Sequence, residues 1–104
     1  MARRQEPEFD RERADLPADL RLREWMRRIE AVLSASAAPV ARDHLARVVR
    51  QGASVDLLIE DLMTDLEGRP YEVAKAGAGR MLRIKPAYAP AIMAAAKVAG
   101  RRWT

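Results

Sequence analysis

The chain of 104 residues contains no cysteine. It therefore forms no disulfide, has no thiolate for metal binding and has no cysteine nucleophile. His44 is its only histidine. Because zinc and related metals are usually held by several Cys or His side chains, we expect neither a metal site nor any other cofactor.

Long apolar runs are also missing. No stretch approaches the roughly 18 apolar residues that cross a bilayer. The longest weakly polar segment, AYAPAIMAAAKVAG, is rich in alanine and is interrupted by Pro90 and Lys97. The first residues mix both charges and lack the apolar region of a secretory signal. We therefore expect no membrane contact and a cytoplasmic location.

Motifs of catalysis are absent as well. The glycines of YEVAKAGAGRMLRIKP, residues 71–86, lie between two expected strands, whereas a phosphate loop places its glycines before a helix N-terminus. No serine lies in a G-x-S-x-G turn. The acidic residues of segment 55–67 fall on the polar side of an expected helix, where a solvated face is typical. We therefore expect no enzymatic activity.

The length allows one hydrophobic core, which predicts a single domain. Residues 1–18 are highly charged, contain two prolines, and carry only Phe9 and Leu16 as large apolar residues. Such a segment buries too little surface to offset its ordering entropy, so we expect a mobile charged arm. Residues 19–99 are then the folded domain and residues 100–104 a basic tail.

Apolar residues at three- and four-residue steps predict helices over residues 20–36, 41–50 and 55–67. Gly52 is expected to break the second helix and Ser54 to cap the third. Segments 71–76 and 80–84 alternate apolar and polar residues around the GAG turn, which predicts a β-hairpin. An alanine-rich closing helix follows Pro86.

Three helices followed by a hairpin are the order of a winged helix-turn-helix, so we expect a mostly α fold whose small hairpin is the wing. AGAG is then most simply the wing turn. A DNA-reading helix needs Lys or Arg near the phosphates. Residues 55–67 instead contain five acids and no Lys, Arg, Asn or Gln. Groove reading by this third helix would be repelled.

Charge and exposure identify two candidate surfaces. The third helix carries an apolar residue, Leu57, off its buried stripe, and Trp103 lies at the chain end, both poor places for a monomer's large apolar groups. We therefore expect the third helix to contact a protein partner. Its candidate residues are Asp56, Leu57, Glu60 and Asp61. The basic residues of the wing are candidates for weak, non-specific contact with DNA backbone. They are Lys75, Arg80, Arg83 and Lys85, with Arg101 and Arg102 in the tail.

Residues 27–93 resemble the N-terminal winged-helix domain of the segregation and condensation protein B (ScpB) family. IEAVLSASAAPV is similar to the family's E-A-[LI]-L-F-A-S-x-x-P-[VI] signature, and RPYEVAKAGAGRMLRIKPAYA to its Y-E-L-V-x-V-A-G-G-[YW]-x-x-R-T-[RK]-P-E-Y pattern. The chain departs from the family at Ser34, which stands at a usual Phe, and at Gly79-Arg80, which replaces the usual Gly-aromatic pair.

The resemblance implies a non-catalytic accessory subunit of the bacterial SMC complex that dimerises and binds an ScpA-like kleisin. It would act at the nucleoid in chromosome segregation and condensation, and so in cell division. The matched positions, such as Tyr71 and Val73 in the first wing strand and Ala76 and Gly77 in the turn, are structural. Family members usually continue into a second winged helix. The alternative interpretation is a small winged-helix DNA-binding regulator.

Overall fold

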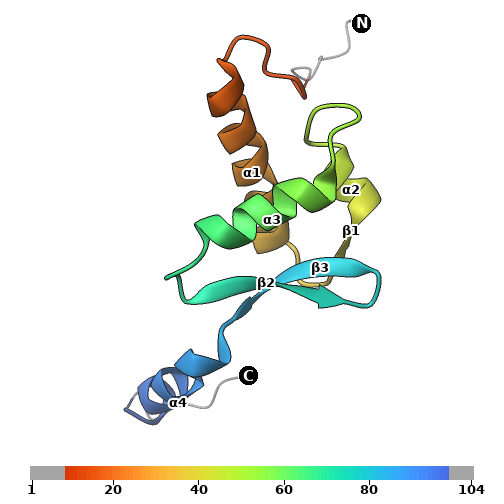
Figure 1. The fold of residues 1–104 in the computed structure, drawn as a ribbon. Coiled ribbons are helices and arrows are strands. Elements are labelled where there is room, and N and C mark those ends of the chain that lie inside the picture. Colours follow the sequence, from red (N-terminus) through yellow and green to blue (C-terminus); the bar gives the residue numbers. More distant parts are fainter. Residues whose placement is uncertain (1–8, 99–104) are drawn as a thin grey trace, which may run out of the picture.

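A computed structural model describes residues 9–98 and confirms the winged helix-turn-helix (Figure 1). Arg101, Arg102 and Trp103 lie outside the described residues, as do the rest of the expected tail and residues 1–8. The elements are α1 (Ala18–Ala35), β1 (Val40–Ala41), α2 (Arg42–Ala46), α3 (Val55–Asp65), β2 (Tyr71–Ala76), β3 (Gly79–Ile84), a 3₁₀ turn η1 (Pro86–Tyr88) and α4 (Ala89–Val98).

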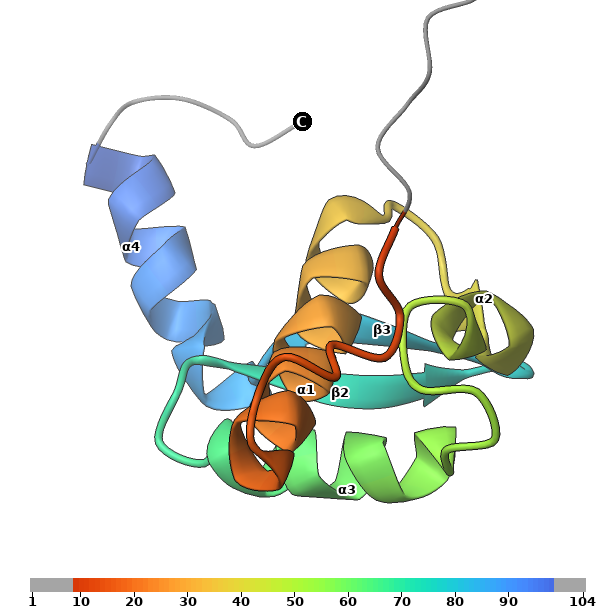
Figure 2. The same cartoon turned by 90° about the horizontal axis from the view of Figure 1, so that it is seen from above.

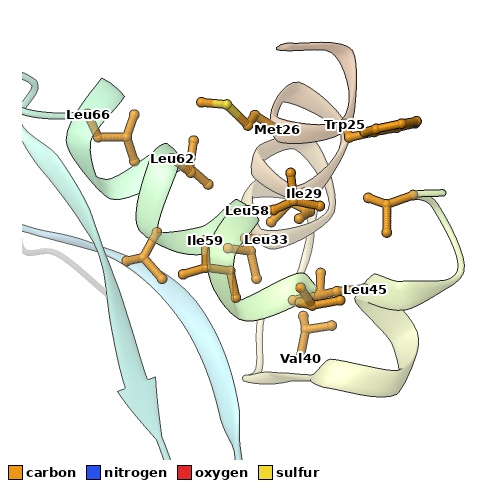
Figure 3. Close-up of a cluster of buried hydrophobic side chains, with 13 residues drawn as sticks. Trp25, Met26, Ile29, Leu33, Val40, Leu45, Leu58, Ile59, Leu62 and Leu66 are labelled. Atoms are coloured by element: carbon orange, nitrogen blue, oxygen red, sulfur yellow. The ribbon is translucent and has the colours of Figure 1, made fainter. Parts of the chain in front are cut away.

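The core lies where α1, α2 and α3 meet the inner face of the sheet (Figure 3). Its centre is fully buried and consists of branched aliphatic side chains, namely Ile29, Leu45, Val49 and Leu62. Trp25 lies at the outer end of the cluster on α1. Among the described residues no polar or charged side chain is buried, so the hydrophobic effect is the main stabilising term.

α3 begins at Val55, as its sequence predicts, and ends at Asp65, two residues before the predicted end. The hydroxyl of Ser54 accepts a hydrogen bond from the backbone N–H of Leu57 at 3.2 Å. This satisfies one of the free amides at the helix start. Gly68 lies three residues beyond Asp65, in the turn that leads to β2, and has a φ of +85°, a conformation that glycine adopts readily.

The second helix is shorter than predicted, ending at Ala46 rather than at residue 50. Two arginine side chains from other segments donate hydrogen bonds to carbonyls that a longer helix would use for its own backbone hydrogen bonds. Arg11 donates to the carbonyls of Ala46 at 2.8 Å and Val49 at 3.0 Å, and Arg28 donates to that of Val48 at 2.9 Å. Because these three carbonyls have hydrogen-bond donors, the backbone can leave the helix after Ala46. Residues 47–52 form a turn, and the side chain of Val49 still lies in the core.

The three-stranded antiparallel sheet has the order β1-β3-β2. Gly77, with φ +60°, makes the tight turn between β2 and β3, as expected for a hairpin loop. The AGAG sequence is therefore the wing turn. Cross-strand partners share one face of a sheet, so Val73 and its partner Leu82 both face the helices.

The last helix does not close the domain, although the sequence predicts a closing helix. In two perpendicular views α4 lies away from the three-helix body (Figures 1 and 2). Its main contacts are with the preceding turn η1, and none of residues 89–97 is buried. The packed core therefore draws only on elements from α1 to β3.

Residues 9–17 lie along the body as a strap, although we expected residues 1–18 to form a mobile arm. Trp25 donates its indole N–H to the carbonyl of Arg11 at 2.9 Å. The backbone N–H of Gln51 donates to Glu12 at 3.0 Å. The guanidinium of Arg28 stacks over Phe9 at 4.5 Å from the ring centre. These contacts give the strap a defined position; its motion stays a prediction.

An ion pair joins α1 to α3 on the surface. Arg27 donates hydrogen bonds to Asp65 on α3 and to Glu30 on its own helix. The bond from Arg27 holds the pKa of Asp65 below its usual range. Asp65 therefore keeps its negative charge to a lower pH than an ordinary aspartate does.

Candidate functional site

Two of the four basic wing residues are paired with acids of the same chain. Arg83 donates to Glu72 across the hairpin at 2.8 Å. Arg80 lies 3.8 Å from Asp56 of α3, and its side chain is only 20% exposed. Ion pairs of this kind add little stability, but each cancels a positive charge that a phosphate would otherwise meet.

Asp56 is the link between the two predicted surfaces. Its carboxylate accepts a hydrogen bond from Arg42 at 2.7 Å and faces Arg80 on the wing. One residue predicted to contact a protein partner and one predicted to contact DNA therefore form a single cluster with Arg42. The cluster lies around a hollow of about 290 Å³ between α2, α3 and the wing.

Lys75 and Lys85 differ from the wing arginines. Neither forms a salt bridge among the described residues, and Lys75 is exposed. They are the wing cations that remain available to a phosphate backbone. DNA contact by the wing stays a prediction, and it rests on two lysines rather than on four residues.

Leu57 is the most exposed large apolar residue of the packed body, with 60% of its surface accessible. It lies beside a hollow of about 440 Å³ bounded by α1, the α2–α3 turn and α3. Leu22 and Trp25 form the wall on α1, and Leu58 forms part of the floor. The prediction that Leu57 points away from the core is confirmed, and the structure adds an apolar hollow beside it.

The hollow beside Leu57 has an acidic border. Asp61 lines it and Glu60 is exposed on the same helix; neither forms a salt bridge within the part of the chain that the structure describes. Arg50 also lines the hollow, but Glu12 of the strap lies 4.0 Å from its guanidinium. We call Leu57, Glu60, Asp61 and the hollow the α3 surface. Asp56 points to the wing and is not part of it.

A second hollow of about 440 Å³ separates the end of α1 from the sheet. Ser34 lines it together with Leu33, Tyr71 and Leu82. This is the position at which the resembling family usually has Phe. The small side chain of serine leaves the space between α1 and β3 open.

Sequence reasoning also missed an apolar face formed by α4 and the residues just before it. Ile84, Tyr88 and Ile92 are all exposed, and together with alanines of the helix they line a hollow of about 340 Å³. The signal was present in the sequence, because a helix with apolar residues on nearly every side is usually buried. The sequence predicts a helix that closes the domain, whereas in the structure α4 stays exposed.

Among residues 9–98 no three His, Asp or Glu side chains come together as a possible metal site. His44 is exposed on α2. No helix within this range combines the length and apolarity needed to cross a membrane.

Comparison with known proteins gives structural likeness without sequence matches. No protein-family model matches the chain, and no curated protein matches its sequence. A crystal structure of a dimer of the ScpB N-terminal domain complexed with an ScpA peptide matches with a TM-score of 0.62 and 24% identity, over 71% of this chain and 96% of that one. ScpB from Mycobacterium tuberculosis matches with a TM-score of 0.64 and 21% identity, over 80% of this chain and 54% of that one.

A conserved hypothetical protein from Chlorobium tepidum also matches, with a TM-score of 0.62 and 20% identity, over 71% of this chain and 49% of that one. The chain thus spans about half the length of two of these proteins and nearly all of the ScpB N-terminal domain. At these identities the shared property is the fold. The resemblance seen in the sequence is confirmed at this level: the chain has the winged-helix fold of an ScpB N-terminal domain.

Proposed function

We propose that this protein is a non-catalytic accessory subunit of an SMC–kleisin complex, acting in chromosome segregation and condensation. In this role it binds a kleisin, associates with a second copy of itself and works at the nucleoid. The observation that carries the proposal is the match to an ScpB N-terminal domain, which in that crystal structure is a dimer bound to an ScpA peptide. The signature-like segments at residues 29–40 and 69–89 support it independently of the fold.

The α3 surface is the proposed kleisin site. An apolar side chain of the kleisin would enter the hollow beside Leu57, because this removes apolar area of both partners from water. Glu60 and Asp61 would then lie beside lysine or arginine residues of the same segment. The expected ligand is therefore a short amphipathic stretch that combines large apolar residues with basic ones.

Calorimetric titration of the full chain with the purified kleisin of the same organism tests this proposal. We expect saturable binding that Leu57→Ala weakens at least about tenfold, as is typical when a central apolar anchor is truncated. Met63→Ala is the matched control, since Met63 lies on the same helix, is 49% exposed and does not line the hollow. It should bind as the wild type does.

Each result has one meaning. Absence of binding by the wild-type chain would contradict the proposed function. Equal binding by wild type and Leu57→Ala would retain the function but reject the α3 surface as the site.

A small DNA-binding regulator is the second candidate, and the observation that favours it is the pair of wing lysines, Lys75 and Lys85, without acidic partners among the described residues. Such a protein would bind duplex DNA with an affinity that falls steeply with salt, and replacing both lysines with alanine would flatten that dependence. The accessory-subunit proposal expects kleisin binding to be unaffected by the same double substitution.

A further inference from the structure

We propose that the apolar face of α4 is the surface through which two copies of this chain associate, with the α4 helices of the two copies packed against each other. The face, which we call the α4 face, consists of Ala91, Ile92 and Ala95 of α4 together with Ile84 at the end of β3 and Tyr88 of η1. The inference rests on the self-association included in the proposed function and names the surface responsible for it.

The first argument is the stability of α4 itself. The helix Ala89–Val98 has 10 residues, and isolated helices shorter than about 12–15 residues are marginal in water even when rich in alanine. Helices of this length are normally held by packing of an apolar face. Within the described residues the body offers α4 little beyond the η1 turn. A second surface is needed to cover the face.

The second argument is the distribution of charge around the helix. Tyr88 ends η1, which leads directly into α4. Ile92 and Ala95 follow Tyr88 by four and seven residues, so the three lie on one side of this continuous helical segment. Lys97, the one charged residue of the helix, lies about half a turn from Tyr88. The residues that line the hollow between α4 and the body include no charged side chain.

This distribution decides in favour of a second copy. In a two-fold interface a surface meets its own image, so any charge near the axis would face a like charge. The α3 surface would place Glu60 and Asp61 near their own copies. The α4 face carries no charge and pairs with itself without repulsion.

The small residues of the face fit the same geometry. Ala91 and Ala95 are one turn apart and both exposed. Their small side chains let a second helix approach closely, while Tyr88 and Ile92 beside them supply apolar area. The hollow of about 340 Å³ next to these alanines has room for side chains of the opposite α4.

Sedimentation velocity of the full chain over a range of concentrations tests the inference. We expect a dimer whose dissociation constant rises at least about tenfold in Ile92→Lys and in Ala95→Lys, because the two-fold axis presents each new charge to its copy. Ala94→Lys is the matched control: the same change, one residue away, directed away from the face. It should dimerise as the wild type does.

A chain without cysteine allows a second measurement that does not rely on disruption. A single Ala95→Cys should be joined into a covalent dimer by a short bismaleimide linker, whereas Ala94→Cys should react as a monomer. A dimeric wild type with unchanged Ile92→Lys and Ala95→Lys variants would overturn the inference alone. A monomeric wild type would overturn the inference and the self-association, while kleisin binding, measured separately, would still decide the rest of the proposed function.

Discussion

The backbone of Gly79 in β3 lies close against that of Val40 in the neighbouring strand β1. A Cβ atom placed on Gly79 would lie 2.9 Å from the carbonyl oxygen of Val40 and 3.0 Å from Cβ of Pro39. Real side chains do not come this close to backbone, so the approach of β1 to β3 requires glycine. The pairing of β1 with the wing thus depends on Gly79, which lies 39 positions after Val40 in the sequence.

We therefore expect Gly79→Ala to lower the free energy of unfolding by about 1–3 kcal/mol, the usual effect of overpacking a buried site. Equilibrium denaturation in urea measures the change. Gly77→Asn is the control, because asparagine tolerates the positive φ of the turn and the Gly77 position is open. A Gly79→Ala variant as stable as the wild type would mean that β1 is not held against β3.

This pair also shows how far the sequence predicts the wing. The GAG segment between two alternating runs predicts a hairpin turn, and Gly77 confirms it. The need for glycine at position 79 has a different origin, close packing against β1, and the two-residue strand Val40–Ala41 has too little pattern to reveal its partner. The local turn was predictable, but the long-range contact was not.

Arg28 connects the strap to the helices. Its side chain is 12% exposed and donates hydrogen bonds to the carbonyls of Asp10, Arg11 and Val48. We expect Arg28→Ala to cost about 1–3 kcal/mol of unfolding free energy, since it leaves the partly buried carbonyl of Val48 without its donor and takes one of two donors from the carbonyl of Arg11. Arg23→Ala, an exposed position on the same helix, should cost far less.

Limited trypsin digestion gives an independent measurement of the same contact. Release of the strap should expose the bond after Arg13, and the Arg28→Ala chain should be cut there faster than the wild type or Arg23→Ala. If all three chains are cut equally fast, the strap already detaches freely in the wild type, which would support the mobile arm expected from the sequence.

The strap and the short second helix escaped prediction for one reason. Composition correctly indicates that residues 9–17 bury little apolar surface, yet guanidinium groups of the strap and of α1 form hydrogen bonds between the strap and the body, with carbonyls up to 38 residues away. Arg28 lies three positions after Trp25, beside the apolar stripe of α1. A positive charge so close to the buried stripe indicates that Arg28 needs hydrogen-bond acceptors. Which carbonyls accept from it depends on how the chain folds, so the sequence alone does not identify them.

The candidate site was predictable in its residues but not in its arrangement. Counting charges along the sequence separates an acidic α3 from a basic wing. Folding brings Asp56 against Arg80 and leaves Leu57 and Asp61 on another side of α3. The acidic helix therefore has two roles: one residue neutralises the wing, and the others border an apolar hollow.

This neutralisation leads to the last prediction. Asp56→Asn removes the acid that pairs with Arg42 and Arg80, so both arginines become available to phosphates. We expect tighter non-specific binding to duplex DNA and a steeper salt dependence, by about 0.9 in the log–log slope for each added phosphate contact. Fluorescence anisotropy at several salt concentrations measures both quantities.

Asp61→Asn is the control variant. It changes the net charge equally but frees no arginine, because Asp61 has no basic partner among the described residues. Equal gains in the two variants would show that net charge alone sets the affinity, whereas a gain confined to Asp56→Asn would show that the contact between α3 and the wing keeps this winged helix from binding DNA.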